Sequence, residues 1–379
     1  WLLTSATNTC GFIVIPSLPI FAGSPQAQAL SAMHGVSSLM LQESFNPRRN
    51  STSIHEPVAC LTTDLFISGR QWLYEVTDSP ASFTLSCGLL RWKKALLYES
   101  NPFNHESRTH FYPKSGNRPP GWWHRYRRPE RRPEPLTLLS THNNPNYFHW
   151  LTQPGLAPLF LQSHFNLHEH QESAIAVSHR PSQALPKFVE PLLSFAAPRA
   201  SKFISLAITS TTSCRFALQQ HDSDVFISPA QLKWLTNLCQ SQFRLKVRPW
   251  RRIYLSRTNA RTRRCLNEQQ LMTALSPYGF QTYCLESLPV EAQLRLFSES
   301  AVVIGPHGAG FANMIACAPS SAIIELLPRP GNYSHYYAMA DQLDLKHGHL
   351  LATDFDPKTD NFSVDPDQLI SLLSLMELI

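Results

Sequence analysis

Residues 301–314 (AVVIGPHGAGFANM) join an apolar run to a glycine-rich turn that contains one histidine. The run is typical of a buried parallel strand, and residues 311–317 predict the start of a helix. Such a turn suits phosphate, because small residues let the ligand approach free backbone N–H groups at the positive end of a helix. His307 adds a side chain that can hydrogen-bond to the phosphate. The turn predicts an enzyme for phosphorylated or nucleotide-linked substrates, although a tight strand-to-helix corner would need the same glycines.

Arginines follow a second predicted strand. Residues 252–256 (RIYLS) run into Arg257, and Arg261, Arg263 and Arg264 come shortly after. An arginine just past the carboxyl end of a strand can bind two oxygens of a diphosphate at once, with a geometry that lysine lacks. We expect this role for Arg257. For Arg261 and Arg263 a solvated basic surface is the simpler interpretation.

One carboxylate stands within an apolar run. Glu325 lies in residues 321–327 (SAIIELL), where burial of an unpaired carboxylate would be costly. It is either paired within the core or placed at the strand end, where it would accept hydrogen bonds from ribose hydroxyls. The sequence leaves both alternatives open.

Asn146, Tyr147, His149 and Trp150 place polar groups and aromatic rings in one corner before a predicted helix. A histidine there could act as a general base or orient a sugar hydroxyl, with Tyr147 or Trp150 stacking on the sugar ring. The alternative is a hydrogen-bonded structural histidine.

The elements that must position these residues alternate regularly after residue 244. Apolar runs predict strands, and helices are predicted between them: one begins at Asn267, with Gln270 completing a capping box, and ends at Gly279, and another is capped by Ser287. This alternation predicts an α/β fold with a doubly wound parallel sheet, whose ligands bind at the carboxyl ends of the strands. The predicted strands are 252–256, 280–285, 301–305 and 321–327.

Composition excludes several classes of protein. The 379 residues carry a net charge of +6, which suits anionic ligands and does not by itself indicate nucleic acid. The eight cysteines include no Cys-x-x-Cys pair, which argues against structural zinc and against a disulfide-rich scaffold. Residues 11–22 are apolar but too short to span a bilayer. The arginines and aromatic residues of 122–132 could bind nucleic acid, but prolines break the segment and we expect an exposed loop.

Taken together, these motifs resemble glycosyltransferase family 61, in its bacterial capsular-polysaccharide branch. The resemblance covers about residues 136–345. It rests on the following residues, in this order: Asn146, Tyr147, His149, Trp150, Leu151, Arg252, Tyr254, Ser256, Arg257, Ala260, Arg264, Asn267, Glu268, Glu291, Gln293, Gly305, His307, Gly308, Ala309, Gly310, Asn313 and Glu325.

The resemblance implies a GT-B-like architecture, with two Rossmann-like domains facing each other across a cleft. The first domain would span residues 1–240 on the acceptor side, with 1–130 poorly defined. A nucleotide-sugar-binding domain would span residues 245–345. Residues 346–379 would form a C-terminal extension that ends in an amphipathic helix from Asp365.

The resemblance also implies inverting transfer of a sugar from a nucleotide donor, usually a UDP-sugar, to a glycan acceptor, without an essential metal or other cofactor. Such a transfer needs a base near the acceptor hydroxyl and positive charge on the leaving diphosphate. Catalytic roles would fall to His149, Arg257 and His307, and the acceptor side would include Asn146, Tyr147, His149 and Trp150. The donor would be bound by Arg257, Arg264, Gly305, His307, Gly308, Ala309, Gly310, Asn313 and Glu325.

The chain departs from the family where an acidic residue often follows the histidine–tryptophan pair. Gln153 stands in that stretch and cannot accept a proton, so a catalytically inactive protein that binds nucleotide sugars or glycans is the alternative function. An ester hydrolase is disfavoured, since the chain has no Gly-x-Ser-x-Gly motif. Asp222–Asp224 and Asp354–Asp356 match an Asp-x-Asp metal motif by letters alone. We expect His168–His170 and His347–His349 to be exposed.

The expected partners are therefore a nucleotide sugar and a glycan acceptor, in polysaccharide or capsule synthesis, with no nucleic acid. The resemblance implies a cytoplasmic enzyme that associates peripherally with the inner face of a bacterial membrane. Three glycosylation sequons, at Asn50, Asn332 and Asn361, would suit the Golgi lumen if the protein were eukaryotic.

Overall fold

The structure of the chain is a computed structural model. It describes residues 248–329 and 334–379 continuously. Before them it describes residues 11–14, 58–61, 66–68, 71–77, 83–86, 89–92, 95–97, 130–132, 136–139, 146–152, 156, 159–160, 163, 174–178, 185–198, 203–206, 208–211, 213–219 and 229–243. The described residues divide into two compact units, one ending at Trp234 and the other beginning at Leu235.

The second unit is built on a five-stranded sheet in which every neighbouring pair is parallel. The strand order is β15-β14-β16-β17-β18. This order is one of the two common doubly wound arrangements, so the expected α/β class and parallel sheet are confirmed. The strands are β14 (Arg251–Leu255), β15 (Phe280–Tyr283), β16 (Ser300–Pro306), β17 (Ala322–Leu327) and β18 (Lys346–Leu351).

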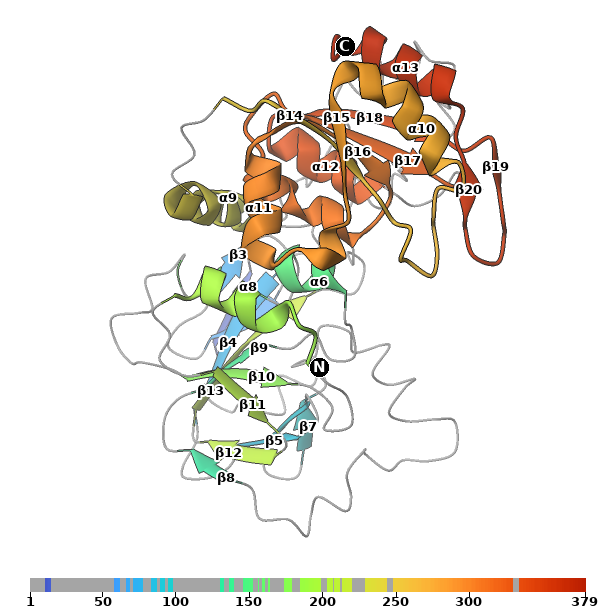
Figure 1. The fold of residues 1–379 in the computed structure, drawn as a ribbon. Coiled ribbons are helices and arrows are strands. Elements are labelled where there is room, and N and C mark those ends of the chain that lie inside the picture. Colours follow the sequence, from blue (N-terminus) through green and yellow to red (C-terminus); the bar gives the residue numbers. More distant parts are fainter. Residues whose placement is uncertain are drawn as a thin grey trace. The chain divides into compact units, whose positions relative to one another are not determined.

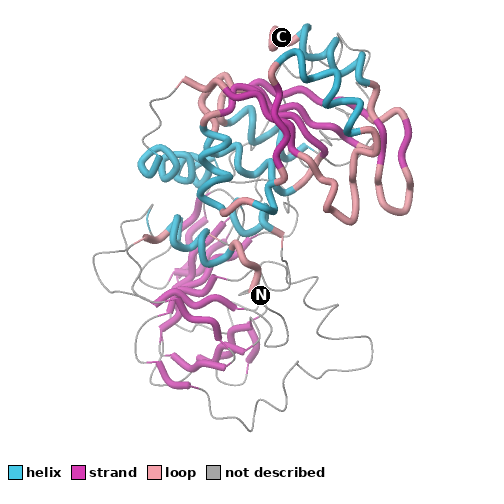
Figure 2. Tube along the Cα trace, viewed as in Figure 1, coloured by secondary structure: helices cyan, strands magenta, loops and turns pink. Residues whose placement is uncertain are grey.

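Helices cover both faces of this sheet. Figure 1 shows α10 and α13 on one side of the strands, with α11 and α12 on the other. Figure 2 shows the same strands in magenta between helices in cyan. The helices are α10 (Glu268–Leu275), η5 (Ser276–Tyr278), η6 (Leu285–Ser287), α11 (Val290–Ser298), η7 (Ala309–Ala316), α12 (Ser334–Gln342) and α13 (Pro366–Leu375).

The sheet continues beyond residue 345. Strand β18 pairs with β17, and Leu369, Leu372 and Leu373 of α13 lie in the buried core with side chains of α10. Residues 346–379 therefore supply a strand and a core helix to this unit. The expectation that residues 347–349 are exposed is wrong, because they form part of β18 and His347 is only 8% exposed.

Two helix starts differ in detail from the sequence prediction. Asn267 does occupy the N-cap of α10, but its Oδ1 accepts a hydrogen bond from the backbone N–H of Val364 at 3.1 Å instead of capping a helix amide. Helix α11 begins at Val290 with Pro289 as its N-cap, so Ser287 is not its cap. The Ser287 hydroxyl donates to the carbonyl of Cys284, at 2.7 Å.

Two other helices differ from the sequence prediction, one in its type and one in the residue at which it ends. The helix predicted after the glycine turn forms as η7, which is a 3-10 helix and not an α-helix. The terminal helix α13 is confirmed, with Asp365 as an N-cap that accepts from the Asp367 N–H at 2.9 Å, but it ends at Leu375.

The first unit contains a six-stranded sheet ordered β11-β10-β9-β13-β4-β3 and a five-stranded sheet ordered β7-β6-β5-β12-β8. Strands β11, β10, β9 and β13 are parallel neighbours, and β13, β4 and β3 pair antiparallel. The strands of the first sheet are β3 (Phe66–Ser68), β4 (Gln71–Thr77), β9 (Leu136–Leu139), β10 (Ala174–Ser178), β11 (Phe203–Leu206) and β13 (Ser213–Gln219). Those of the second are β5 (Phe83–Ser86), β6 (Leu89–Trp92), β7 (Ala95–Leu97), β8 (Glu130–Arg132) and β12 (Ile208–Thr211).

The described residues before 244 include the helices α6 (Tyr147–Thr152), α8 (Val189–Ala196) and α9 (Pro229–Phe243). Two short antiparallel pairs complete the described strands, β1 (Gly11–Val14) with β2 (Val58–Leu61), and β19 (Asp354–Phe355) with β20 (Phe362–Ser363). No helix in the described ranges combines the length and apolar character needed to cross a membrane.

Gly279 provides a test of the turn between η5 and β15. Its φ of +77° is left-handed, and a Cβ there would meet no atom within 4 Å. The replacement Gly279→Ala should therefore cost only the backbone strain, about 1–2 kcal/mol. We expect a lower urea midpoint for Gly279→Ala and a smaller loss for Gly279→Asn, since asparagine tolerates this conformation. Equal midpoints for the wild type and Gly279→Ala would contradict the assignment.

Candidate functional site

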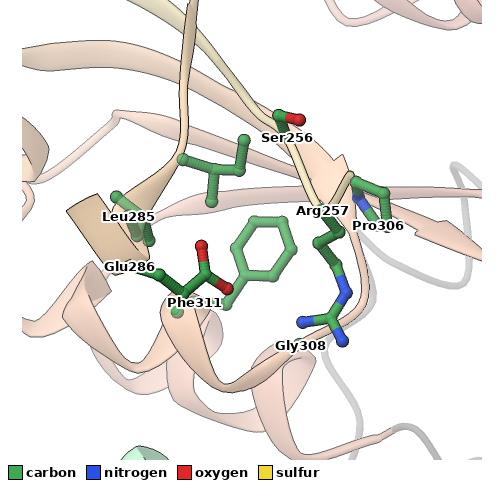
Figure 3. Close-up of a pocket in the computed structure, with 9 residues that line it drawn as sticks. Ser256, Arg257, Leu285, Glu286, Pro306, Gly308 and Phe311 are labelled. Carbon is green, nitrogen blue, oxygen red and sulfur yellow. The ribbon is translucent and has the colours of Figure 1, made fainter. Parts of the chain in front are cut away.

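A hollow of about 300 Å³, counting space open to solvent, lies at the carboxyl ends of β14 and β16. The chain leaves β14 toward β15 on one side and later continues from β16 toward β17 on the other, so the two neighbouring strands diverge here. Ligands of doubly wound sheets bind at such switch points. The hollow is lined by Leu255, Ser256, Arg257, Leu285, Glu286, Pro306, Gly308, Gly310 and Phe311 (Figure 3).

Arg257 supplies the positive charge of the hollow. Its Nη2 donates to the carbonyl of Thr262 at 3.2 Å, whereas its buried Nε has no hydrogen-bond partner. Burial lowers the pKa of Arg257, and the like charge of Arg263 lowers it further, while Glu286 acts in the opposite direction. An arginine stays charged despite such shifts. A partly desolvated guanidinium with an unused donor is a strong site for an anion.

The glycine turn lies directly against this guanidinium. A Cβ at Gly308 would overlap Nη1 of Arg257, so the close approach seen in Figure 3 requires glycine. The carbonyl of Gly308 accepts a hydrogen bond from the buried hydroxyl of Tyr336, at 2.8 Å. Burial raises the pKa of Tyr336, so the phenol remains protonated and keeps donating. Through this hydrogen bond, helix α12 holds the glycine turn in place.

A hydrogen-bonded chain joins the turn to the opposite wall. The side-chain amide of Asn313 donates to Gly310 O and to Gln293 Oε1, both at 3.0 Å. The Gln293 amide in turn donates to the carbonyls of Leu285 and Leu288, both at 2.9 Å. Asn313 was expected to bind the nucleotide, and its completely buried side chain instead connects these two segments. The amides therefore fix the spacing between the glycine turn and η6.

Of the two alternatives for Glu325, the structure shows the one in which its carboxylate is paired within the core. Its carboxylate is 1% exposed, with Oε1 2.7 Å from Nδ1 of His307 and Oε2 3.0 Å from Nε2 of His347. Because an ionised carboxylate only accepts, these bonds assign a proton to each of the two ring nitrogens. The bonds tie β16, β17 and β18 together beneath the glycine turn.

Both histidines are neutral near pH 7. Burial lowers the pKa of His307 to about 4, against the opposing effect of Glu325, and burial lowers the pKa of His347 to about 3. A neutral His307 adds no positive charge to the site. It is not among the residues that line the hollow, and its ring packs edge-on against His335 with centroids 4.9 Å apart.

The remaining donor-side residues have different surroundings. Gly305 lets β14 and β16 pack closely, because a Cβ there would lie 2.8 Å from Cβ of Leu255. Ala309 begins η7 and does not line the hollow. Arg264 is exposed, and its backbone N–H donates to Asn361 Oδ1 at 2.9 Å. Among the arginines that the structure describes, Arg257 is the one that lines the hollow.

The acceptor-side residues belong to the first unit. Asn146 caps α6, since its Oδ1 accepts from the Phe148 N–H at 2.9 Å. His149 is partly buried in α6. Trp150 is 2% exposed and packs against Phe188, so its ring is already covered by protein. Tyr147 is partly buried and also contacts Phe188, with ring centroids 5.3 Å apart.

Several sequence motifs fall outside the hollow or outside the described residues. Gln153, His168–His170 and Asp222–Asp224 lie in ranges that the structure does not describe, as do residues 122–129. Asp354–Asp356 lies on the exposed β19 hairpin. Within the described ranges, no group of three or more His, Cys, Asp or Glu side chains could hold a metal ion. The absence of a metal requirement stays a prediction.

Three contributors to this region were missed by sequence reasoning. Glu286 follows β15 and lines the hollow, His347 binds Glu325, and Tyr336 binds the glycine turn. Only Glu286 had a signal in the sequence, its place just past a predicted strand. The other two depend on contacts between segments far apart in the chain.

Gly308→Ala should weaken anion binding in the hollow. The added methyl group must displace the Arg257 guanidinium, while Gly308 has an extended φ of −176° that alanine can adopt. We expect pyrophosphate affinity to fall by about tenfold or more, from the loss of at least one charge-assisted hydrogen bond. Isothermal titration calorimetry measures the change, with Gly279→Ala as the control that is strained but distant. Unchanged affinity in Gly308→Ala would contradict the geometry.

Stability should fall as pH is lowered from 6.5 toward 4. The unfolded histidines take up protons below about 6.5, whereas folded His307 does so only near 4 and folded His347 only near 3, so protons favour the unfolded state in this window. Each such histidine contributes a slope of roughly 1.4 kcal/mol per pH unit. Urea unfolding at several pH values should give a shallower slope for His347→Gln than for the wild type. Identical slopes would contradict the buried neutral assignment.

One family model matches a stretch of sequence that includes both α6 and the residues that line the hollow. Residues 147–324 match the family model Glycosyltransferase 61. The match begins in α6, contains His149, Arg257 and the glycine turn, and stops one residue before Glu325. A search of curated proteins found no match. The family match supports a glycosyltransferase family 61 domain over residues 147–324 and identifies the activity of the protein as that of a glycosyltransferase.

Proposed function

We propose that the protein is an inverting glycosyltransferase that transfers a sugar from a UDP donor to a glycan acceptor, in polysaccharide or capsule synthesis. The observation that carries the donor site is the unused, buried Nε of Arg257 in the hollow beside Gly308. An anion is the ligand that this donor lacks. The family match makes the diphosphate of a nucleotide sugar the best candidate for that anion.

The proposed reaction is a single displacement. The acceptor hydroxyl attacks the anomeric carbon, the bond from that carbon to the diphosphate oxygen breaks, and the hydroxyl proton passes to a base. Negative charge then develops on the departing diphosphate, where Arg257 and the backbone N–H groups of the glycine turn would stabilise it. The charge of Arg263, close enough to shift the pKa of Arg257, would add to this field. Protein cations can thus replace a metal ion in the proposed mechanism.

His149 is the proposed base, since a histidine can take a proton near neutral pH. This role requires the two-lobed GT-B arrangement, in which the acceptor-side unit and the nucleotide-binding unit face one another. His307 receives a supporting role instead. Its Nδ1 bond to Glu325 holds the strand that leads into the turn, and its pKa of about 4 leaves it uncharged.

The alternative is a protein that binds nucleotide sugars or glycans without transfer. It is favoured by Gln153, which stands where family members often carry an acidic residue. A protein of this kind would use the same hollow for UDP, so binding alone does not separate the two functions.

Release of UDP from a panel of UDP-sugars, with and without glycan acceptors, tests the proposal. Arg257→Lys keeps the charge but loses the fork geometry, so we expect kcat/KM to fall by about 10- to 100-fold. Arg261→Lys, at an exposed neighbouring position, is the matched control and should retain activity. His149→Ala should lower kcat while leaving UDP affinity unchanged.

Three results would contradict the proposal. Tight UDP binding without turnover of any donor would support the inactive binding protein. Failure to bind UDP would reject UDP as the nucleotide of the donor. Equal activity in Arg257→Lys and the wild type would remove the hollow as the donor site.

A further inference from the structure

The two charged walls of the hollow face each other without pairing. Arg257 and Glu286 both line it, and neither forms an ion pair with the other or with any other described residue within 4.0 Å. Figure 3 shows the guanidinium beside Gly308 and the Glu286 carboxylate on the other side of the Phe311 ring. Opposite charges held apart in one hollow leave room for a ligand that carries both an anion and hydrogen-bond donors.

Glu286 is well placed to accept such donors. It lies in η6, directly after β15, so its carboxylate stands at the same carboxyl edge of the sheet as Arg257. Oε2 accepts a hydrogen bond from the Cys284 thiol at 3.1 Å, and no bond to Oε1 is present among the described residues. A thiol is a weak donor, so both oxygens retain capacity for a stronger one.

The wall that carries Glu286 is also held rigidly. Gln293 donates to the carbonyls of Leu285 and Leu288, on either side of Glu286, and Asn313 connects Gln293 to the glycine turn. The separation between the carboxylate-bearing segment and the phosphate-binding turn is therefore set by four hydrogen bonds. A fixed separation favours a ligand of fixed internal spacing.

We propose that Glu286 is a specificity-determining residue that accepts hydrogen bonds from the ribose hydroxyls of the nucleotide, while Arg257 binds its diphosphate. This inference rests on the proposed function and deepens it. A vicinal diol offers two O–H donors to the two oxygens of a carboxylate, and the ribose is joined directly to the diphosphate. The site thereby selects ribonucleotides over deoxyribonucleotides. Recognition of a ribose by an acidic side chain after a strand of a doubly wound sheet follows the same chemistry as in dinucleotide-binding folds.

Calorimetric titration of the full chain with UDP, 2′-deoxy-UDP and pyrophosphate tests this inference. The wild type should bind UDP roughly tenfold more tightly than 2′-deoxy-UDP, the size of one hydrogen bond to a charged group. In Glu286→Ala the preference should shrink to about one, with UDP affinity reduced and pyrophosphate affinity unchanged or raised, since a negative charge is removed. Retained pyrophosphate binding also shows that the variant is folded. Glu291→Gln, an exposed carboxylate on α11 paired with Arg295, is the matched control.

The outcomes separate the two proposals. If Glu286→Ala keeps the wild-type preference, or if the wild type shows no preference, the ribose contact is overturned while the donor site can stand. If Arg257→Ala binds pyrophosphate and UDP as tightly as the wild type, the donor site itself is overturned. If the protein binds GDP more tightly than 2′-deoxy-GDP and does not bind UDP, the ribose contact is supported and a uracil nucleotide is rejected as the donor.

Discussion

The buried carboxylate of Glu325 is the constraint on which the nucleotide side of this protein depends. A charge that is 1% exposed is tolerated only when its oxygens are hydrogen-bonded, and both are, to rings on the two neighbouring strands. Loss of either histidine would leave a lone pair unsatisfied in the core. The carboxylate therefore fixes the positions of β16, β17 and β18 relative to one another. Because the glycine turn begins where β16 ends, its position depends on the same bonds.

The hollow is shaped as much by missing side chains as by those present. Without a Cβ at Gly308, the guanidinium of Arg257 can lie on the turn, and without one at Gly310 the side chain of Leu285 can pack beside it. Tyr336 and Asn313 then use the turn carbonyls as acceptors. Hydrogen bonds to its carbonyls thus hold the turn in place, while Arg257 lies beside it with an Nε that has no hydrogen-bond partner.

The regular part of the fold could be predicted from the sequence because its signals are local. Apolar runs and glycines located the strands up to residue 327 and the end of the helix at Gly279. Strand β18 was missed because its letters, KHGHLL, look polar until Glu325 is known to face His347. Ser287 looked like a cap, yet Pro289 already supplies the extended residue before α11. At the site, the position of Arg257 in the hollow could be predicted from its place after a strand. The distinct roles of His307 and Asn313 could not, since they depend on pairings across the sheet.

The position of β18 late in the chain has a consequence for synthesis on the ribosome. Translation delivers the glycine turn, β17 and Glu325 before His347 exists, so one oxygen of the carboxylate lacks its histidine donor in the nascent chain. The core between the sheet and α10 is likewise incomplete until the leucines of α13 have been synthesised. Domains fold as units once their chain has emerged. This unit can reach its native packing only after about residue 376 has left the exit tunnel. Until then, the hollow that we propose as the nucleotide site would not be fully formed.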